Sequence, residues 1–146
     1  MIIQTKHFGD VEITEEDVLT FEYGIPGFDD LTKFVILGKT DVESPFFWLQ
    51  SLEESGVAFV ISDPFNYVSD YEAEIDMFTA NLLKITNEND ALIYCIVTVP
   101  QDIQKISINL KAPVIINAKE NRGCQVVLEN DKYKFKHIIT EEFVKA

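Results

Sequence analysis

The chain has 146 residues, 47% of them hydrophobic, which is enough for a single domain with its own core. It carries 25 acidic and 12 basic residues, a net charge of −13, and residues 1–76 hold 17 of the acids and only 3 of the bases. Such a surface argues against direct RNA or DNA binding, which depends on Lys and Arg. It favours a basic protein partner or serves solubility alone, and composition leaves both explanations open.

The chain shows no sign of a membrane segment. Its longest apolar run, residues 91–97, is far shorter than the ~20 residues that a spanning helix needs. The N-terminus, Met-Ile-Ile-Gln-Thr-Lys-His, lacks the layout of a signal peptide. We therefore expect a cytoplasmic protein in which residues 1–146 form one domain.

The first predicted element is a hairpin of residues 2–8 and 11–13, with Gly9-Asp10 as a type II′ turn. A hydroxyl and three acids in residues 14–17 favour a short helical turn, and residues 19–23 return as a strand. Gly24-Ile-Pro-Gly-Phe28 then forces a tight loop that presents Ile25 and Phe28. These two side chains either plug one end of a barrel or form an exposed partner contact, and the sequence alone does not separate the two.

A second hairpin is the centre of the predicted fold. Residues 46–52 and 57–62 are aromatic and β-branched runs, joined by a polar turn that contains Gly56. The first run is apolar on both faces and holds the single Trp48, which is typical of a central strand. Asp63-Pro64 ends the second strand, because proline cannot donate to a β-ladder.

An acidic stripe follows in residues 67–77, where a period of two predicts a strand. Its acidic face consists of Asp70, Glu72, Glu74 and Asp76. Its other face consists of Tyr71, Ala73, Ile75 and Met77. Four like charges on one face repel each other, so we expect them in solvent near a sheet edge, either as a guard against strand pairing or as a landing site for a basic partner.

The second half predicts one helix and several strands. Apolar residues at helical spacing indicate a short helix over residues 78–85. The predicted strands are residues 91–99, which are buried, 103–110, 114–116, and a closing hairpin of 125–128 with 133–139. In that hairpin Lys132, Lys134 and Lys136 form a basic face, which either pairs with the acidic stripe within the sheet or is solvated.

The residues that could carry chemistry are few. His7 and His137 lie in strand-like stretches outside any catalytic or zinc motif, and Cys95 and Cys124 lack metal-site spacing, so both thiols are expected to be free and buried. A Cys/His pair stays open only if the fold brings two of these residues together. The sequence thus favours a binding protein without metal or cofactor over an enzyme.

Six motifs, in order, resemble those of the flagellar assembly factor FliW family. They are Phe21-x-x-Gly24-Ile-Pro-Gly-Phe28, Pro45-Phe-x-Trp-Leu-Gln-Ser51, Ala58-Phe59 with Asp63-Pro64, Val97-Thr-Val-Pro100, Asn109-Leu-Lys-Ala-Pro113 and Gln125-Val-Val-Leu128. The resemblance covers nearly the whole chain. It implies a mainly β fold, a small antiparallel β-barrel with one or two short helices, and no catalytic role.

The resemblance also implies two partners. FliW-like proteins bind flagellin and CsrA, a small RNA-binding dimer that represses flagellin synthesis. Binding to CsrA relieves the repression, and newly made flagellin occupies the factor and restores it. A flagellin chaperone without translational control is the alternative, and a barrel that holds a small ligand is a further one.

We assign candidate partner-binding residues on this basis. Our hypothesis is that Asp70, Glu72, Glu74 and Asp76 face CsrA, which must be basic where it holds RNA. For flagellin, whose contact surface we expect to be an apolar helix, an exposed Ile25 or Phe28 is the candidate anchor.

Overall fold

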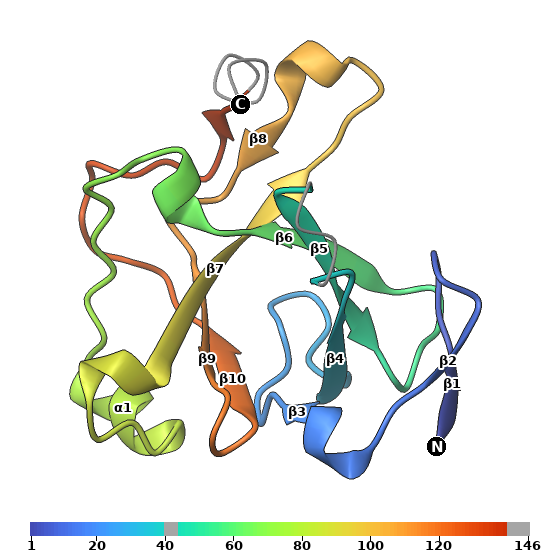
Figure 1. The fold of residues 1–146 in the computed structure, drawn as a ribbon. Helices are drawn as coiled ribbons and strands as arrows, with labels where there is room; N and C mark the ends of the chain where they lie inside the picture. Colours follow the sequence, from blue (N-terminus) through green and yellow to red (C-terminus); the bar gives the residue numbers. More distant parts are fainter. Residues whose placement is uncertain (40–43, 140–146) are drawn as a thin grey trace.

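The structure is a computed structural model that describes residues 1–39 and 44–139 (Figure 1). Its first strands are β1 (Ile2–Gln4), β2 (Asp10–Glu12), β3 (Leu19–Thr20), β4 (Lys33–Leu37), β5 (Phe46–Ser51) and β6 (Ala58–Ser62). The later strands are β7 (Ala91–Thr98), β8 (Ser107–Ile108), β9 (Val114–Asn117), β10 (Arg122–Gln125) and β11 (His137–Ile138). The α-helix is α1 (Met77–Leu82), and single 3-10 turns are Glu15–Asp17, Pro64–Asn66, Glu88–Asp90 and Ile103–Lys105. The chain is therefore mainly β with a short helix, as predicted.

Nine strands form one sheet, and seven of them, β3 to β7 with β9 and β10, close into a ring. The order is β11-β8-β7-β6-β5-β4-β3-β10-β9, and β9 also pairs with β7. The long strand β7 makes closure possible, because residues 95–97 pair with β6 while residues 91–94 pair with β9. Strands β8 and β11 extend the sheet beyond the ring, where β8 pairs with residues 97–98 of β7. Hydrogen bonds therefore pass from strand to strand around the ring without an open edge between β7 and β9.

One pairing departs from the antiparallel pattern. Strands β3 and β10 are parallel and pair only at Thr20 and Arg122, where the Thr20 N–H donates to Asn121 O at 2.8 Å. Strand β3 is also shorter than predicted, because the chain turns directly after it and the Gly24 N–H donates back to Phe21 O. The ring is thus joined most weakly at this point.

The central hairpin is confirmed. Strand β5 lies between β4 and β6, and Phe47 and Leu49 are buried. Its other face is covered at Trp48 by the His7 ring, whose centroid lies 4.0 Å from the indole. The buried Gln50 side chain donates to carbonyls of the following turn and accepts from the Lys6 N–H, so it ties the turn and the N-terminal loop to β5. These contacts explain why the sequence predicts that both faces of β5 are covered.

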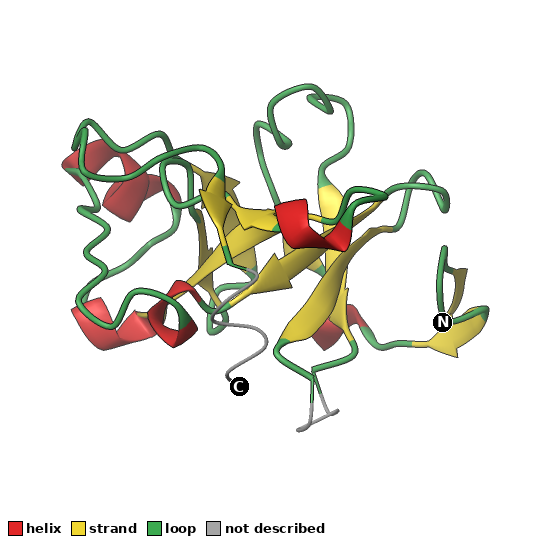
Figure 2. Cartoon of the chain, turned by 90° about the horizontal axis from the view of Figure 1, so that it is seen from above, coloured by secondary structure: helices red, strands yellow, loops and turns green. Residues whose placement is uncertain are grey.

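The core has two main parts. The cluster inside the ring consists of Leu19, Phe21, Ile25, Phe34, Phe47, Leu49, Ile61, Tyr94, Val114 and Ile116. The second cluster consists of Tyr71, Cys95, Val97, Ile106, Ile108, Leu110, Leu128, Tyr133 and Ile139. Figure 1 shows α1 at one side of the strands and the separate β1–β2 hairpin at the other, and Figure 2 shows the same arrangement from above.

The N-terminal hairpin forms with a different turn from the predicted one. Gln4 pairs with Asp10, so the connection is residues 5–9 and not Gly9-Asp10 alone. The Thr5 hydroxyl donates to Gly9 O at 2.7 Å and accepts from the Phe8 N–H, which stabilises the longer loop. The predicted turn at residues 14–17 is present, with Thr14 and Asp17 forming a capping box.

The predicted closing hairpin of residues 125–128 and 133–139 was wrong. The loop of residues 109–113 lies between the two segments and takes their backbone partners. The Leu128 N–H donates to Lys111 O, and the N–H groups of Leu110 and Lys111 donate to Lys134 O. Strand β11 pairs with β8 instead, and the predicted strand 103–110 is a 3-10 turn followed by the short β8.

Candidate functional site

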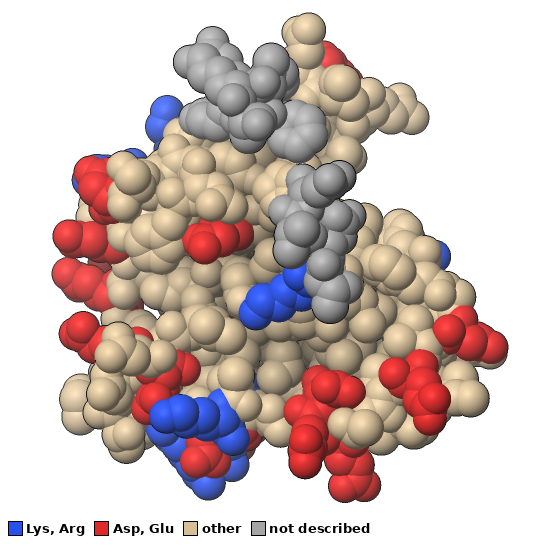
Figure 3. All heavy atoms as spheres, viewed as in Figure 1, with Lys and Arg blue, Asp and Glu red and all other residues tan. Residues whose placement is uncertain are grey.

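The acidic stripe is an exposed, extended segment that belongs to no strand. We call residues 70–76 the acidic segment. Exposure alternates along it as the sequence predicts, with Asp70, Glu72, Glu74 and Asp76 exposed. The alternation ends there, because Met77, predicted for the opposite face, begins α1 and is 76% exposed. Figure 3 shows acidic side chains in a column at the left margin, where this segment runs in Figure 1. The predicted strand was therefore wrong, whereas the predicted solvent-facing carboxylates are confirmed.

Two tyrosines hold the acidic segment in place of a neighbouring strand. The buried Tyr71 hydroxyl donates to Leu110 O at 2.7 Å, and the Glu72 N–H donates to the Tyr133 hydroxyl at 2.8 Å. The two tyrosine rings pack with centroids 4.6 Å apart. The segment is therefore anchored at Tyr71 and Glu72 by two side-chain hydrogen bonds and a ring contact, without a β-ladder.

The two ends of the acidic segment are also fixed. Asp76 caps α1, accepting from the Thr79 N–H at 2.8 Å, and this hydrogen bond lowers the pKa of the Asp76 carboxyl. At the other end Asp70 pairs with Lys132 at 3.5 Å, and both side chains are exposed. Pairing of the basic face with the acidic stripe was one of two open interpretations, and it occurs at Lys132 but outside any sheet, not within the sheet as that interpretation supposed. Surface pairs of this kind contribute only about 0–1 kcal/mol.

Hollows lie on both sides of the acidic segment. The larger, of about 850 Å³, lies between the segment and residues 85–93, and the smaller, of about 260 Å³, lies between the segment and residues 126–130. Both contain Glu72 and Glu74 and have apolar side chains, among them Ile75. Among the described residues that line the two hollows, none is Lys or Arg. The acidic segment therefore lies between two hollows, each lined by both acidic and apolar side chains.

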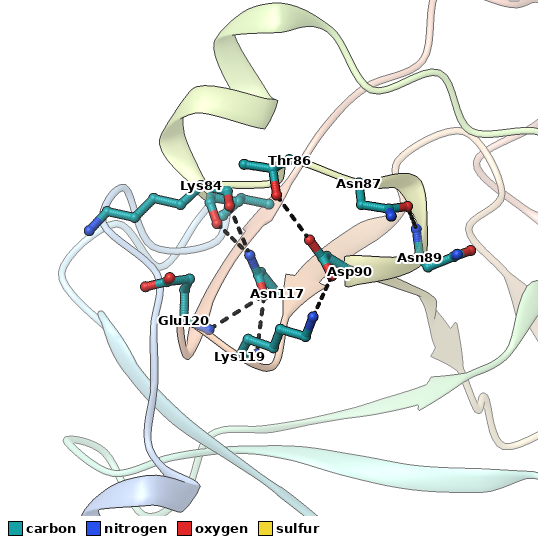
Figure 4. Close-up of polar contacts among 9 residues, drawn as sticks. Lys84, Thr86, Asn87, Asn89, Asp90, Asn117, Lys119 and Glu120 are labelled. Carbon is teal, nitrogen blue, oxygen red and sulfur yellow. Dashed lines mark hydrogen bonds and ion pairs between the residues drawn. The ribbon is translucent and has the colours of Figure 1, made fainter.

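The wall of the larger hollow continues into a polar network that sequence reasoning missed (Figure 4). The buried Asn117 amide donates to Leu83 O at 2.9 Å and accepts from the Lys119 N–H. Lys119 in turn pairs with Asp90 at 2.9 Å. This network fixes the turn after α1 to the end of β9, and the signal in the sequence was only a polar residue at the end of an apolar run.

The two residues of the glycine-rich loop separate. Ile25 is 2% exposed and belongs to the core inside the ring, in agreement with the plug interpretation, whereas Phe28 is 38% exposed and packs edge-on against Phe59. Gly24 is required here, since its φ is +66° and an added Cβ would lie 2.6 Å from Phe28 O. Of the pair, Phe28 is the side chain that a partner can reach.

Sequence reasoning also missed an exposed aromatic pair. The predicted helix is present, but Thr79 and Leu83 are its buried positions, so Phe78 is 64% exposed. Its ring stacks on Tyr23 at a centroid distance of 6.5 Å, and Tyr23 is 61% exposed. The apolar spacing was consistent with Phe78 facing inward, and only the tertiary packing rotates the helix.

The cysteines are free and buried, as predicted. Burial raises the pKa of the Cys95 thiol to about 12 and that of Cys124 to about 11. Both thiols are therefore protonated at neutral pH and are poor nucleophiles. In residues 1–39 and 44–139 no group of His, Cys, Asp and Glu could hold a metal ion, and no helix there is long and apolar enough to cross a membrane.

Comparison with known proteins decides the family. The family model described as FliW protein matches residues 2–139. The chain belongs to the FliW family. A flagellar assembly factor FliW of Caldanaerobacter subterraneus subsp. tengcongensis is 47% identical over 146 residues, covering 100% of this chain and 97% of the relative. One of Alkaliphilus metalliredigens is 44% identical over 145 residues, covering 99% and 90%.

A solved structure extends the likeness to the fold. The crystal structure of a flagellar assembly factor FliW superposes with a TM-score of 0.88 at 42% identity, covering 95% of this chain and 96% of that chain. FliW proteins are bacterial flagellar assembly factors, so the six motifs of the sequence identified the family correctly. The family name itself does not specify partners or contact residues.

Proposed function

We propose that this FliW protein binds CsrA and antagonises its repression of translation, that it also binds flagellin, and that exchange between the two couples flagellin synthesis to export. The observation that carries the CsrA part is the acidic segment, which presents four exposed carboxylates on an anchored backbone. A protein that holds RNA must present basic side chains, and complementary charge steers such a protein to this surface.

Anchoring matters for affinity. The segment is held near its start by the hydrogen bonds of Tyr71 and of the Glu72 N–H and at its end by the cap of α1, so residues 73–75 span only a short distance between two fixed points. The backbone therefore has limited freedom to lose on binding, and less of the binding energy is spent on ordering it. The same acidic charge disfavours competition for RNA itself, so the proposed antagonism acts on the protein and without direct nucleic-acid binding. We place this activity in the cytoplasm, where translation occurs.

For flagellin we propose an apolar contact. The exposed Phe28 is the candidate anchor, while Ile25 supports the loop from within the core. The stacked pair of Tyr23 and Phe78 offers a second exposed aromatic surface. Aromatic side chains of this kind are the usual anchors of protein interfaces, and they suit the apolar face of a helix.

Charge reversal tests the CsrA surface. In the variant Glu72→Lys with Glu74→Lys, we expect association with CsrA to slow strongly at low salt and its salt dependence to flatten, because exposed charges act over about one Debye length of 8–10 Å. The matched control is Glu15→Lys with Glu16→Lys. This exposed acidic pair lies in the blue turn before β3, away from the acidic segment (Figure 1).

Three outcomes would contradict the proposal. Unchanged binding of the Glu72 and Glu74 variant at low salt would show that CsrA does not use the acidic segment. An equal loss in the control would show that only the net charge of −13 matters. Capture of flagellin but not of CsrA in parallel pull-downs would favour a chaperone without translational control.

A further inference from the structure

The backbone of residues 73–75 is without hydrogen-bond partners inside the part of the chain that the structure describes. These residues belong to no strand, and the backbone bonds that flank them are the one from the Glu72 N–H to the Tyr133 hydroxyl and the one from the Ala80 N–H to Asp76 O. An extended backbone with free N–H and C=O groups can add a further strand, because these groups are the ones a β-ladder uses.

The direction of these groups follows from alternation. In an extended chain successive N–H groups point to opposite sides. The Glu72 N–H donates to the Tyr133 hydroxyl and so points to the side on which Tyr133 lies. Alternation then places the N–H and C=O groups of Ala73 and Ile75 on the opposite side, which we identify with the larger hollow because Ala73 lines that hollow and not the smaller one.

The larger hollow is chemically suited to one kind of occupant. Its volume is about 850 Å³. Apolar lining comes from Phe65, Ile85 and Ile93, and acidic lining comes from Glu72, Glu74 and Glu88. A chain lying in it would have apolar side chains against the first group and basic side chains beside the second.

We propose that this hollow receives an extended basic segment of a protein partner, which pairs as an antiparallel strand with Ala73 and Ile75. The proposal rests on the proposed function of the acidic segment as a partner-binding surface, and it names the chemistry of the segment bound there. Residues opposite Ala73 and Ile75 face inward and are apolar, and their own N–H groups point to this chain. Residues between them lie on the outward face with Glu72 and Glu74 and are Lys or Arg.

The probe is the synthetic peptide acetyl-Lys-Val-Lys-Val-Lys-Val-amide, titrated into the intact protein and followed by NMR. Hydrogen exchange of the Ala73 and Ile75 amides should slow on binding, while that of the Glu74 amide, on the opposite edge, should not. A peptide N-methylated at its valines should bind about tenfold more weakly, or worse, than one N-methylated at its lysines, because only the valine N–H groups donate to this chain.

Three results would overturn the inference. They are equal weakening by the two methylated peptides, peptide binding without protection of Ala73 and Ile75, and no binding of the peptide. Binding of CsrA without protection of these two amides would also overturn it while leaving the proposed function intact. Conversely, strand addition by the peptide to a chain that does not bind CsrA would support the inference and contradict the proposed function.

Discussion

Removing either hydroxyl of the tyrosine pair should destabilise the fold by different amounts. In Tyr71→Phe the lost hydroxyl leaves the carbonyl of Leu110 unpaired, and both residues are buried, at 3% and 2% exposed. An unsatisfied buried acceptor costs about 1–3 kcal/mol. In Tyr133→Phe the Glu72 N–H loses its partner, but this group lies in an exposed residue and water replaces the hydroxyl, so we expect about 0.5–1.5 kcal/mol.

Urea unfolding followed by the fluorescence of Trp48 measures both variants. The two substitutions delete the same atom from rings that touch each other, so each is the matched control of the other. The midpoint should fall further for Tyr71→Phe, with an unchanged dependence of the free energy of unfolding on urea. A smaller loss for Tyr71→Phe than for Tyr133→Phe, or no loss in either, would refute the role given to the two hydroxyls.

Three further predictions concern the core, the thiols and the helix cap. Gly123→Ala should destabilise by about 1–3 kcal/mol in the same unfolding assay, because its Cβ would lie 2.5 Å from Cζ of the buried Phe21, and a neutral result would contradict this packing. The pKa of Cys95 is raised to about 12, so the buried thiol makes its full contribution to the free energy of unfolding below its ordinary pKa near 9. As the pH rises from 9 toward 12, this contribution falls by about 1.4 kcal/mol per pH unit. Cys95→Ala should remove this dependence of the free energy of unfolding on pH. An unchanged dependence in the variant would show that the Cys95 thiol does not cause it. Asp76→Ala should cost about 1 kcal/mol, whereas Asp76→Asn should cost much less, because an amide oxygen still accepts from the Thr79 N–H; equal costs would contradict the cap.

Local patterns in the sequence predicted the elements that depend on near neighbours. The β5–β6 hairpin follows from two apolar runs and a polar turn, and the Asp63-Pro64 stop ends β6 where expected. The period of two in residues 70–76 also predicted exposure correctly, because alternation requires only that one face pack against something. It did not reveal that Tyr71 and Tyr133 side chains, and not a strand, supply that packing.

Long-range pairing was beyond local patterns. Closure of the ring depends on β7 pairing with β9 over residues 91–94 and on the single parallel contact of Thr20 with Arg122. Neither is encoded in a turn or a period. The wrong hairpin at the C-terminus has the same origin, since residues 109–113 compete for the hydrogen bonds that two neighbouring apolar runs would otherwise share.

The sequence predicted those site residues whose exposure follows from their charge. It did not predict those whose exposure depends on how an element is rotated against the core. The four carboxylates were found because repulsion keeps like charges in solvent. Phe78 was missed because its spacing fits an inward face equally well, and the burial of Ile25 was one of two open interpretations. The free backbone of residues 73–75 could not be anticipated at all, since the same pattern predicts a paired strand.

The measurement that tests the central claim most directly is calorimetric titration of this protein with purified CsrA, repeated after saturation with flagellin. We expect tight binding of CsrA that disappears when flagellin is present, which would establish the exchange of partners. CsrA binding that survives saturation would mean separate, uncoupled sites and would contradict the exchange. No binding of CsrA in either titration would contradict translational control and favour a flagellin chaperone.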